Sequence, residues 1–205
     1  MKNPIILGIA AVTLLLGACA TNTTFTSTWK APDATVLKPE GKRLAAVFIG
    51  RDESTRREAE DTLVRRLDAA GAQGVASYTL VPNNEARDID GVKERLAAAG
   101  INGAVVMRVI GKRERVSYTP TPVFAPYYQH FWGYWGYGWC AAYKPIATTD
   151  EVVSVETLIY SLDRDELLWA GTSRTVNPSK VPDFVNEVAD AAAKEMQKQG
   201  LLAAG

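Results

Sequence analysis

Residues 44–110 alternate between short apolar runs and amphipathic stretches, and this alternation constrains the fold more than any other feature of the sequence. The runs at 44–50, 75–81 and 103–110 have the length and apolar content of strands that are buried on both faces. Between them, residues 55–70 and 92–99 repeat apolar side chains at helical spacing. A strand-helix-strand-helix-strand order with right-handed crossovers predicts three parallel strands covered by helices.

The first of these helices has a start signal and two distinct faces. Thr55 followed by Glu58 has the pattern of a capping box. The inward face is predicted to carry the apolar residues at helical spacing, which are Ala59, Leu63, Val64, Leu67 and Ala70. The opposite, solvated face is predicted to carry the charged residues Arg56, Arg57, Glu60, Arg65 and Arg66.

The second half of the chain predicts an antiparallel addition to this sheet. After residue 110 the sequence becomes charged and then proline-rich, so the third strand is expected to extend out of the core before a long loop. Residues 151–162 and 167–176 are predicted strands joined by a polar turn. A last helix begins near Pro182, with an inward stripe formed by Phe184, Val185, Val188, Ala189, Ala192 and Met196. The predicted fold class is α/β with a mixed sheet, in a single domain over residues 44–200.

Residues 127–143, which we call the aromatic segment, hold nine of the chain's eighteen aromatic residues. Glycines separate these aromatics, and glycine weakens both helices and strands, so a loop is expected over about 118–148. Loops of more than about 12–15 residues without secondary structure are usually functional or disordered.

Three interpretations of the aromatic segment remain open. Tyr and Trp are frequent anchors of binding hot spots, which favours a protein or glycan partner such as peptidoglycan. Their polar-tipped rings also suit a membrane surface, and a segment that folds back over its own domain would have no partner. On the first interpretation the partner-binding residues are Trp132, Tyr134, Trp135, Tyr137 and Trp139.

Residues 1–18 have the layout of a secretory signal peptide. Met1 and Lys2 give a positively charged start, residues 5–16 are almost entirely apolar, and small residues follow. The apolar run is shorter than the roughly 20 residues that a membrane-spanning helix needs. An uncleaved amino-terminal helix is the alternative.

The end of this segment, Leu16 to Cys19, resembles the lipobox of bacterial lipoproteins. The resemblance implies cleavage between Ala18 and Cys19 and lipidation of Cys19 by a thioether diacylglycerol and an acyl chain on its amine. A single myristoyl chain binds membranes only marginally, so stable anchoring needs more than one chain. Ala20 in place of Asp resembles the sorting state for the outer membrane, with the domain facing the periplasm.

Residues 19–43 are expected to be the lipid anchor followed by a flexible tether. The segment is rich in Thr, Ser, Pro and Lys and shows no sustained periodicity. Phe25 and Trp29 interrupt the polar composition and are expected to pin part of the tether onto the domain.

Composition argues against a nucleic-acid partner. Lys and Arg together number 23, as do Asp and Glu. Binding to phosphate groups needs a basic surface, which this balance does not predict.

No catalytic or metal-binding constellation stands out. His130 is the only histidine and lies in the aromatic segment, without the rigid frame that a nucleophile–base pair needs. One histidine and Cys140 fall short of a zinc site, and the acidic turn 163–166 does not match an EF-hand loop. No phosphate-binding or nucleophile-elbow motif occurs. We expect no metal, no cofactor and no enzymatic activity; the alternative is a hydrolase whose carboxylates converge only in the folded protein.

A family resemblance rests on the lipobox, the Thr-rich segment with Trp29, the strand-helix pattern, residues 155–160, and Leu168 to Gly171. Together they resemble a broad group of bacterial outer-membrane lipoproteins. The domain is also similar in outline to the amino-terminal domain of TolB and to the lipoprotein activators of penicillin-binding proteins. The resemblance implies a periplasmic α/β domain and supplies no catalytic residues.

We therefore expect a non-enzymatic envelope lipoprotein. It would be attached to the membrane by its lipid and would present the aromatic segment to a protein or glycan partner. A structural lipoprotein that self-associates through Cys140 or a sheet edge is a further alternative.

Overall fold

The computed structural model describes residues 22–119, 131, 135 and 146–202. Six strands form one sheet in the order β1-β6-β5-β4-β2-β3. The strands are β1 (Thr23–Lys30), β2 (Arg43–Ile49), β3 (Gln73–Ala76), β4 (Gly103–Thr119), β5 (Ile146–Ser161) and β6 (Glu166–Val176). The helices in the described residues are α1 (Glu53–Ala69), α2 (Ile89–Ala98) and α4 (Val181–Lys198), with a 3₁₀ turn η1 (Ser77–Thr79).

The sheet is mixed, which confirms the predicted fold class. Strand β2 pairs in parallel with both β3 and β4. The pairs β4–β5, β5–β6 and β1–β6 are antiparallel. The strand predicted over 75–81 is shorter, because after Ala76 the chain turns into η1, where the Tyr78 amide donates to the Glu60 carboxylate of α1 at 2.8 Å.

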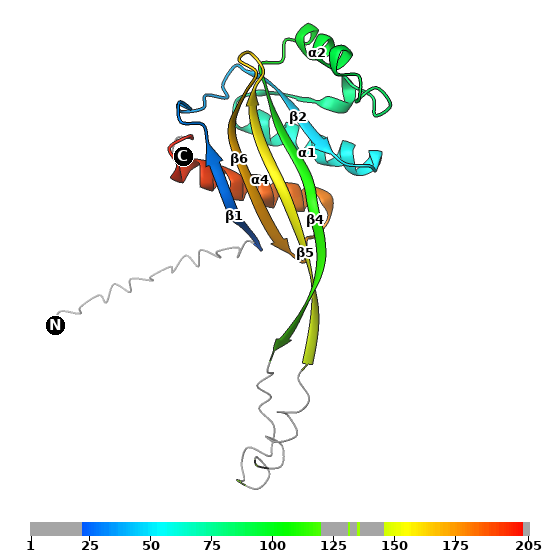
Figure 1. Ribbon diagram of the computed structural model, residues 1–205, viewed down its shortest axis with the longest axis vertical. Coiled ribbons are helices and arrows are strands. Elements are labelled where there is room, and N and C mark those ends of the chain that lie inside the picture. Colours follow the sequence, from blue (N-terminus) through cyan, green and yellow to red (C-terminus); the bar gives the residue numbers. More distant parts are fainter. Residues whose placement is uncertain (1–21, 120–130, 132–134, 136–145, 203–205) are drawn as a thin grey trace, which may run out of the picture.

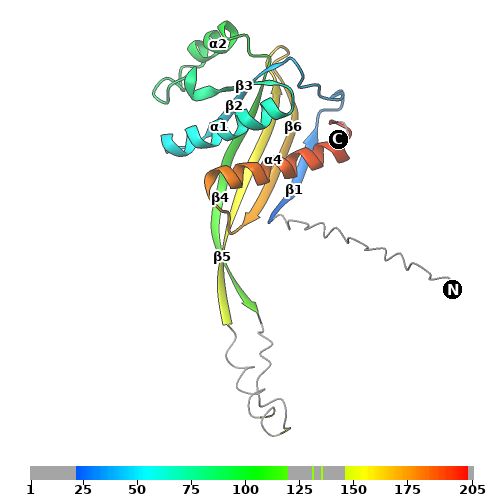
Figure 2. The same cartoon turned by 180° about the vertical axis from the view of Figure 1, so that it is seen from behind.

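The two faces of the sheet are covered differently. Helices α1 and α4 lie on one face (Figures 1 and 2), where Ala46, Phe48 and Met107 pack against residues such as Leu63 and Val188. Helix α2 serves the opposite face, because Leu96 and Ala99 pack near Ala45 and Ala104. Successive residues of a strand point to opposite faces, so Ala45 and Ala46 belong to different layers. The large face beside α2 is left without a covering helix in the described part of the chain.

Strand β1 corrects the prediction of a flexible tether. Residues 23–30 pair antiparallel with β6 as an edge strand. The Phe25 ring packs on Trp169 with 5.6 Å between ring centroids, as the tether prediction had expected for this aromatic. The Thr-rich composition that resembled a tether is also that of a strand, since β-branched residues fit a pleated surface. The sheet therefore begins at Thr23 rather than at residue 44.

Helix α1 begins earlier than the capping-box pattern predicted. Its N-cap is Asp52, whose Oδ2 accepts hydrogen bonds from the Ser54 hydroxyl at 2.6 Å and the Thr55 amide at 2.7 Å. These bonds favour the charged carboxylate and lower the pKa of Asp52 to about 2. Thr55 lies in the first turn and is not the cap.

Two of the residues predicted on the solvated face of α1 are buried. Glu60 is 0% exposed and Arg56 is 6% exposed. They lie in the same helical stripe as Leu63 and Leu67, because positions three, four and seven residues apart share a face. The spacing of Arg56 and Glu60 places them on the inward face, whereas their charge had led to the prediction of a solvated position.

Ala70, predicted on the inward face of the first helix, is instead its exposed C-cap, because α1 ends at Ala69. The later helices follow the predicted periodicity. Helix α2 is followed by Gly100 in a left-handed conformation (φ 66°), which glycine adopts readily after a helix. The inward stripe of α4 buries Val185, Val188, Ala192 and Met196. The polar turn between β5 and β6 is exposed, and Asp165 takes a positive φ of 51° there.

Candidate functional site

Strands β4 and β5 continue beyond the end of the sheet as a two-stranded ribbon. Strand β6 ends at the pair Val152–Val176, whereas β4 and β5 remain paired as far as Thr119 and Ile146. We call residues 114–119 and 146–151 the arm and the rest of the described chain the body. Figure 1 shows the arm leaving the body at one end. Six residues of strand correspond to about 20 Å.

Asn177 holds the base of the arm. It follows β6 directly, and its backbone N–H donates to the Glu151 carbonyl at 2.7 Å. Its side-chain Oδ1 accepts from the Glu151 N–H at 2.8 Å, and its Nδ2 donates to Asp150 Oδ1 at 2.9 Å. Asn177 adopts a left-handed conformation (φ 49°), which Asn tolerates better than most residues. It thus ties the first residues of the arm to the body after β6 has ended.

Where side-chain burial is described, the β4 strand of the arm is exposed to solvent. Glu114, Arg115 and Val116 are all exposed. Lys112 and Glu151 form an ion pair across its base at 2.7 Å. The sequence change from apolar to charged residues after position 110 predicted this departure from the core, and the structure confirms it.

The aromatic segment lies within the connection at the far end of the arm, where two of its residues are described. Phe131 is 63% exposed and Trp135 is 53% exposed. Both have helical backbone, where a loop was predicted, and their rings lie 5.9 Å apart. The other predicted partner-binding residues, Trp132, Tyr134, Tyr137 and Trp139, lie outside the described residues, as do His130 and Cys140.

The start of β1 lies at the end of the body from which the arm leaves. Thr23 pairs with Thr175, which pairs with Val153, which pairs with Lys112 at the arm's base. Ala18 and Cys19, the predicted cleavage and lipidation residues, lie outside the described residues. Only the few residues after Cys19 separate it in sequence from this end of the sheet.

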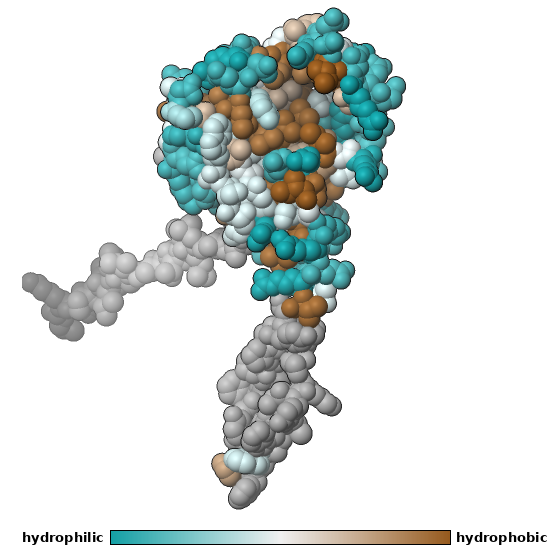
Figure 3. Space-filling model, in the orientation of Figure 1, coloured by the Kyte–Doolittle hydropathy of each residue, from teal (hydrophilic) through white to brown (hydrophobic). Residues whose placement is uncertain are grey.

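The face of the sheet away from α1 and α4 carries an apolar row. Pairing aligns Trp29, Ala170, Leu158, Val106 and Val47 across five strands. Figure 3 shows hydrophobic side chains gathered on this face, framed by polar ones. Trp29 is 48% exposed and does not pin β1 in the way that Phe25 does.

Arg56 and Glu60 form a buried network at the carboxyl ends of β2 and β3. The Arg56 guanidinium donates to Glu60 Oε1 at 2.9 Å, to Ser77 Oγ at 2.9 Å and to the Val81 carbonyl at 3.1 Å. Glu60 also accepts from the Phe48 amide at 3.0 Å and from Ser77 Oγ at 2.8 Å. Glu60 has no exposed surface, and its carboxylate already accepts hydrogen bonds from Arg56, Ser77 and the Phe48 amide. A substrate cannot reach this carboxylate, so the network serves to join α1 to the strands.

A cavity of about 870 Å³ lies between the sheet, α1, α4 and the segment after β1. Its walls are largely Leu, Ala and Met side chains, and Asp163 is the one carboxylate among the described lining residues. A glycoside hydrolase needs two carboxyl groups flanking its substrate. This cavity therefore has the walls of a binding site and lacks a carboxylate pair in the described residues.

The described residues contain neither a cluster of metal ligands nor a membrane-spanning helix. They contain no group of three His, Cys, Asp or Glu side chains that is arranged to hold a metal ion. No helix among them combines the length and apolar character needed to cross a membrane.

Several of these features have no signal in the sequence. The clamp at Asn177 depends on a contact between residues 26 positions apart, and the cavity depends on how α4 packs against the sheet. The burial of Arg56 and Glu60 had a signal in their spacing relative to Leu63, which the charged residue types outweighed.

Comparisons with known proteins give little further guidance. No protein-family model matches the sequence, and no curated protein matches it significantly. Solved structures that are similar include a PelC dodecamer from Paraburkholderia phytofirmans in space group P6, with 14% identity and a TM-score of 0.46 over 82% of this chain and 94% of that chain. A variant of the same PelC in space group C2 gives 13% identity and a TM-score of 0.44 over 80% and 94%. Likeness at this level carries no argument about the function or assembly of this chain.

Proposed function

We propose that this chain is a non-enzymatic envelope lipoprotein that is anchored in the outer membrane through Cys19 and faces the periplasm. It presents the aromatic segment to a protein or glycan partner. The observation that carries the proposal is the arm, a paired ribbon that continues past the body and leads to a segment with nine aromatic residues. Phe131 and Trp135 expose large apolar surfaces, as the anchors of a binding site do before the partner covers them.

The lengths of the two connections favour a partner close to the membrane. Four residues from Cys19 to Thr23 span at most about 14 Å. Lys112 lies in the same row across the sheet as Thr23, and the seven residues from Lys112 to Thr119 extend about 23 Å beyond that row. An anchor this short keeps the arm's end within reach of the membrane surface, so contact with lipid is the outcome that an experiment must separate from partner binding.

In-cell photo-crosslinking tests the proposal. A photoreactive residue replaces Trp135 in the full chain, and the control replaces Ile89, which is exposed on α2 outside the arm. A discrete protein or glycan adduct from position 135 that is absent from position 89 is expected. Lipid adducts alone, or equal adducts from both positions, would contradict a partner-binding segment.

The anchor has a separate test. Cys19→Ala removes the acceptor of the lipid, and the chain is expected to lose its incorporation of labelled palmitate and leave the outer-membrane fraction. Cys140→Ser is the matched control and is expected to change neither. Unchanged palmitate incorporation by Cys19→Ala would refute the lipid anchor.

Self-association is the second candidate, and the apolar row on the open face favours it. A photoreactive residue at Leu158 would crosslink two copies of the chain if that face were an interface between them. Absence of such dimers in cells that give a position-135 adduct would exclude this candidate.

A further inference from the structure

The cavity beside α4 exists because small side chains face a wide part of the sheet. The core is divided into a cluster around Phe48 and Val188 and a second cluster around Trp169 and Met196. Between them α4 contributes Ala189, Ala192 and Ala193 to the lining. Protein interiors are normally packed as densely as organic crystals, so a space of this size at the centre of a small domain needs an explanation.

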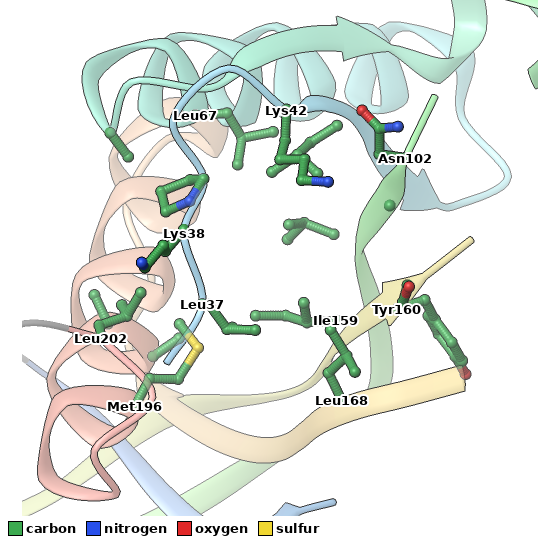
Figure 4. A pocket seen from close by; sticks show the side chains of 18 of the residues that line it. Leu37, Lys38, Lys42, Leu67, Asn102, Ile159, Tyr160, Leu168, Met196 and Leu202 are labelled. Atoms are coloured by element: carbon green, nitrogen blue, oxygen red, sulfur yellow. The ribbon is translucent and has the colours of Figure 1, made fainter. Parts of the chain in front are cut away.

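The walls of this cavity suit an apolar chain. Six leucines from five parts of the fold line it together with Met107 and Met196, and these leucines are Leu37, Leu44, Leu63, Leu67, Leu168 and Leu202. Figure 4 shows Leu37, Ile159 and Leu168 converging on its interior. Its volume of about 870 Å³ lies in the range of small-molecule sites. Covering apolar walls of this kind with an apolar ligand removes them from water and is favourable.

One end of the cavity is polar and carries positive charge. Figure 4 shows Lys42 and Asn102 together at this end. The Lys42 ammonium lies 4.0 Å from Asp163 Oδ2, at the outer limit of an ion pair, and both side chains are about half exposed. Of the four cations in the lining, Arg66 is paired with Asp190 and Arg164 with Glu166, which leaves Lys38 and Lys42 against the single lining carboxylate of Asp163. This end is therefore suited to an anionic group.

A hydroxyl without a partner lies deeper in the lining. Thr157 is 2% exposed, and its Oγ1 is buried without a hydrogen-bond partner in the described part of the chain. Because this oxygen is itself covered by protein atoms, a ligand in the cavity does not reach it, and Thr157 marks only how deep the lining extends. Thr157 pairs with Met107, four residues along β4 from Gly103 at the polar end, a distance of about 13 Å.

We propose that this cavity binds a single-chain fatty acid. The carboxylate lies at Lys42 and the chain runs along the leucine and methionine walls toward Thr157. This proposal does not rest on the aromatic segment or on the function proposed above.

Photoaffinity labelling of the full chain in its membrane tests the proposal, because it reports where a probe binds rather than how much enters the lipid. The probe is dodecanoate with a diazirine near the end of its chain. Labelling is expected on peptides of β4 and α4 that line the cavity. Dodecanoate should compete for this labelling. Labelling confined to peptides that do not line the cavity would overturn the proposal.

Variants of two alanines on α4 provide the matched control. Ala193 lines the cavity and Ala191, two residues away, does not. Ala193→Phe is expected to reduce cavity labelling about tenfold by filling the space, which corresponds to about 1.4 kcal/mol. Ala191→Phe should retain the labelling. Circular dichroism shows whether both variants fold, and equal labelling of two folded variants would contradict a site in this cavity.

A polar substitution tests the orientation of the chain. Lys42→Gln is expected to weaken competition by dodecanoate about tenfold, as loss of a charge-assisted hydrogen bond does, and to leave competition by dodecanol unchanged. Equal weakening of dodecanoate and dodecanol would refute the orientation.

Discussion

Strands β4 and β5 run through two different environments, the body and the arm. In the body, side chains of these strands such as Met107 and Val155 are buried against α1 and α4. In the arm, β4 exposes Glu114, Arg115 and Val116 to solvent, and β5 exposes Thr149. Burial of apolar area stabilises the body, whereas the arm depends on its backbone ladder and on the contacts of Asn177 at its base. Two-stranded ribbons alone are at best marginally stable in water, so the arm takes its order from the body.

Because burial stabilises the body, substitution of its fully buried aromatic residue Trp169 is expected to cause the largest loss of stability. Trp169 is fully buried, packs against Phe25 and Met196, and donates its indole N–H to Gln199 at 3.1 Å. Trp169→Ala is expected to lower the free energy of unfolding by about 3–5 kcal/mol, measured by denaturant titration. The control is Trp29→Ala on the open face, which should cost much less. Equal losses would mean that the helix-covered face is not the stabilising one.

The buried pair of α1 gives the next largest effect. Glu60→Gln removes the charge that balances Arg56 and is expected to destabilise the protein by about 3 kcal/mol, because an unpaired buried charge remains. The exposed pair Glu53–Arg57 on the same helix is the control, and Glu53→Gln should cost less than about 0.5 kcal/mol. A small effect at Glu60 would show that water reaches the network.

Substitution of Asp52, the N-cap of α1, is expected to change the stability of the protein by an amount that depends on pH. The pKa of Asp52 is lowered from 3.8 to about 2 by the bonds from Ser54 and Thr55. A lowered pKa means that its contribution to stability is complete above pH 3.8 and is lost as the pH falls toward 2. The difference in stability between the wild type and Asp52→Asn should therefore be constant near neutral pH and should shift against the wild type only below about pH 4. A difference that is independent of pH down to pH 2 would contradict this role of the carboxylate.

The arm predicts the smallest effect on global stability. Asn177→Gly keeps the left-handed backbone conformation accessible but removes the side-chain bonds to Glu151 and Asp150. The free energy of unfolding should change by less than about 1 kcal/mol, while amide hydrogen exchange across 146–151 should become faster. A loss comparable to that of Trp169→Ala would show that the arm belongs to the cooperative core.

The sequence predicted those parts of the molecule whose signals are local. The strand at 103–110 and the stripe of α4 follow from periodicity that packing on a sheet enforces. The edge strand β1 was missed because its partner, β6, lies more than 140 positions away in the sequence. The division between buried and exposed charges on α1 was missed because burial depends on partners such as Ser77 and Val81 that the helix itself does not contain.

The candidate sites were predictable to different degrees. The aromatic residues stand out by composition, and the charged residues after 110 announced that the strand leaves the core. The cavity could not be predicted from the sequence, because the sequence does not distinguish an alanine that faces an empty space from one that packs against a close neighbour. That the Thr157 hydroxyl has no partner in the described part of the chain is likewise evident only when its surroundings are known.

The proposed function requires that the arm hold Trp135, in the aromatic segment, away from the body. Electron paramagnetic resonance measures this separation, with spin labels on cysteines introduced by Trp135→Cys and Arg174→Cys in a chain that carries Cys140→Ser. Arg174 is an exposed residue of β6 close to the base of the arm. With the arm extended, the distance distribution should lie beyond about 20 Å, the length of the arm. A main population at shorter distances would mean that the segment folds back over the sheet, and the proposed function would be wrong.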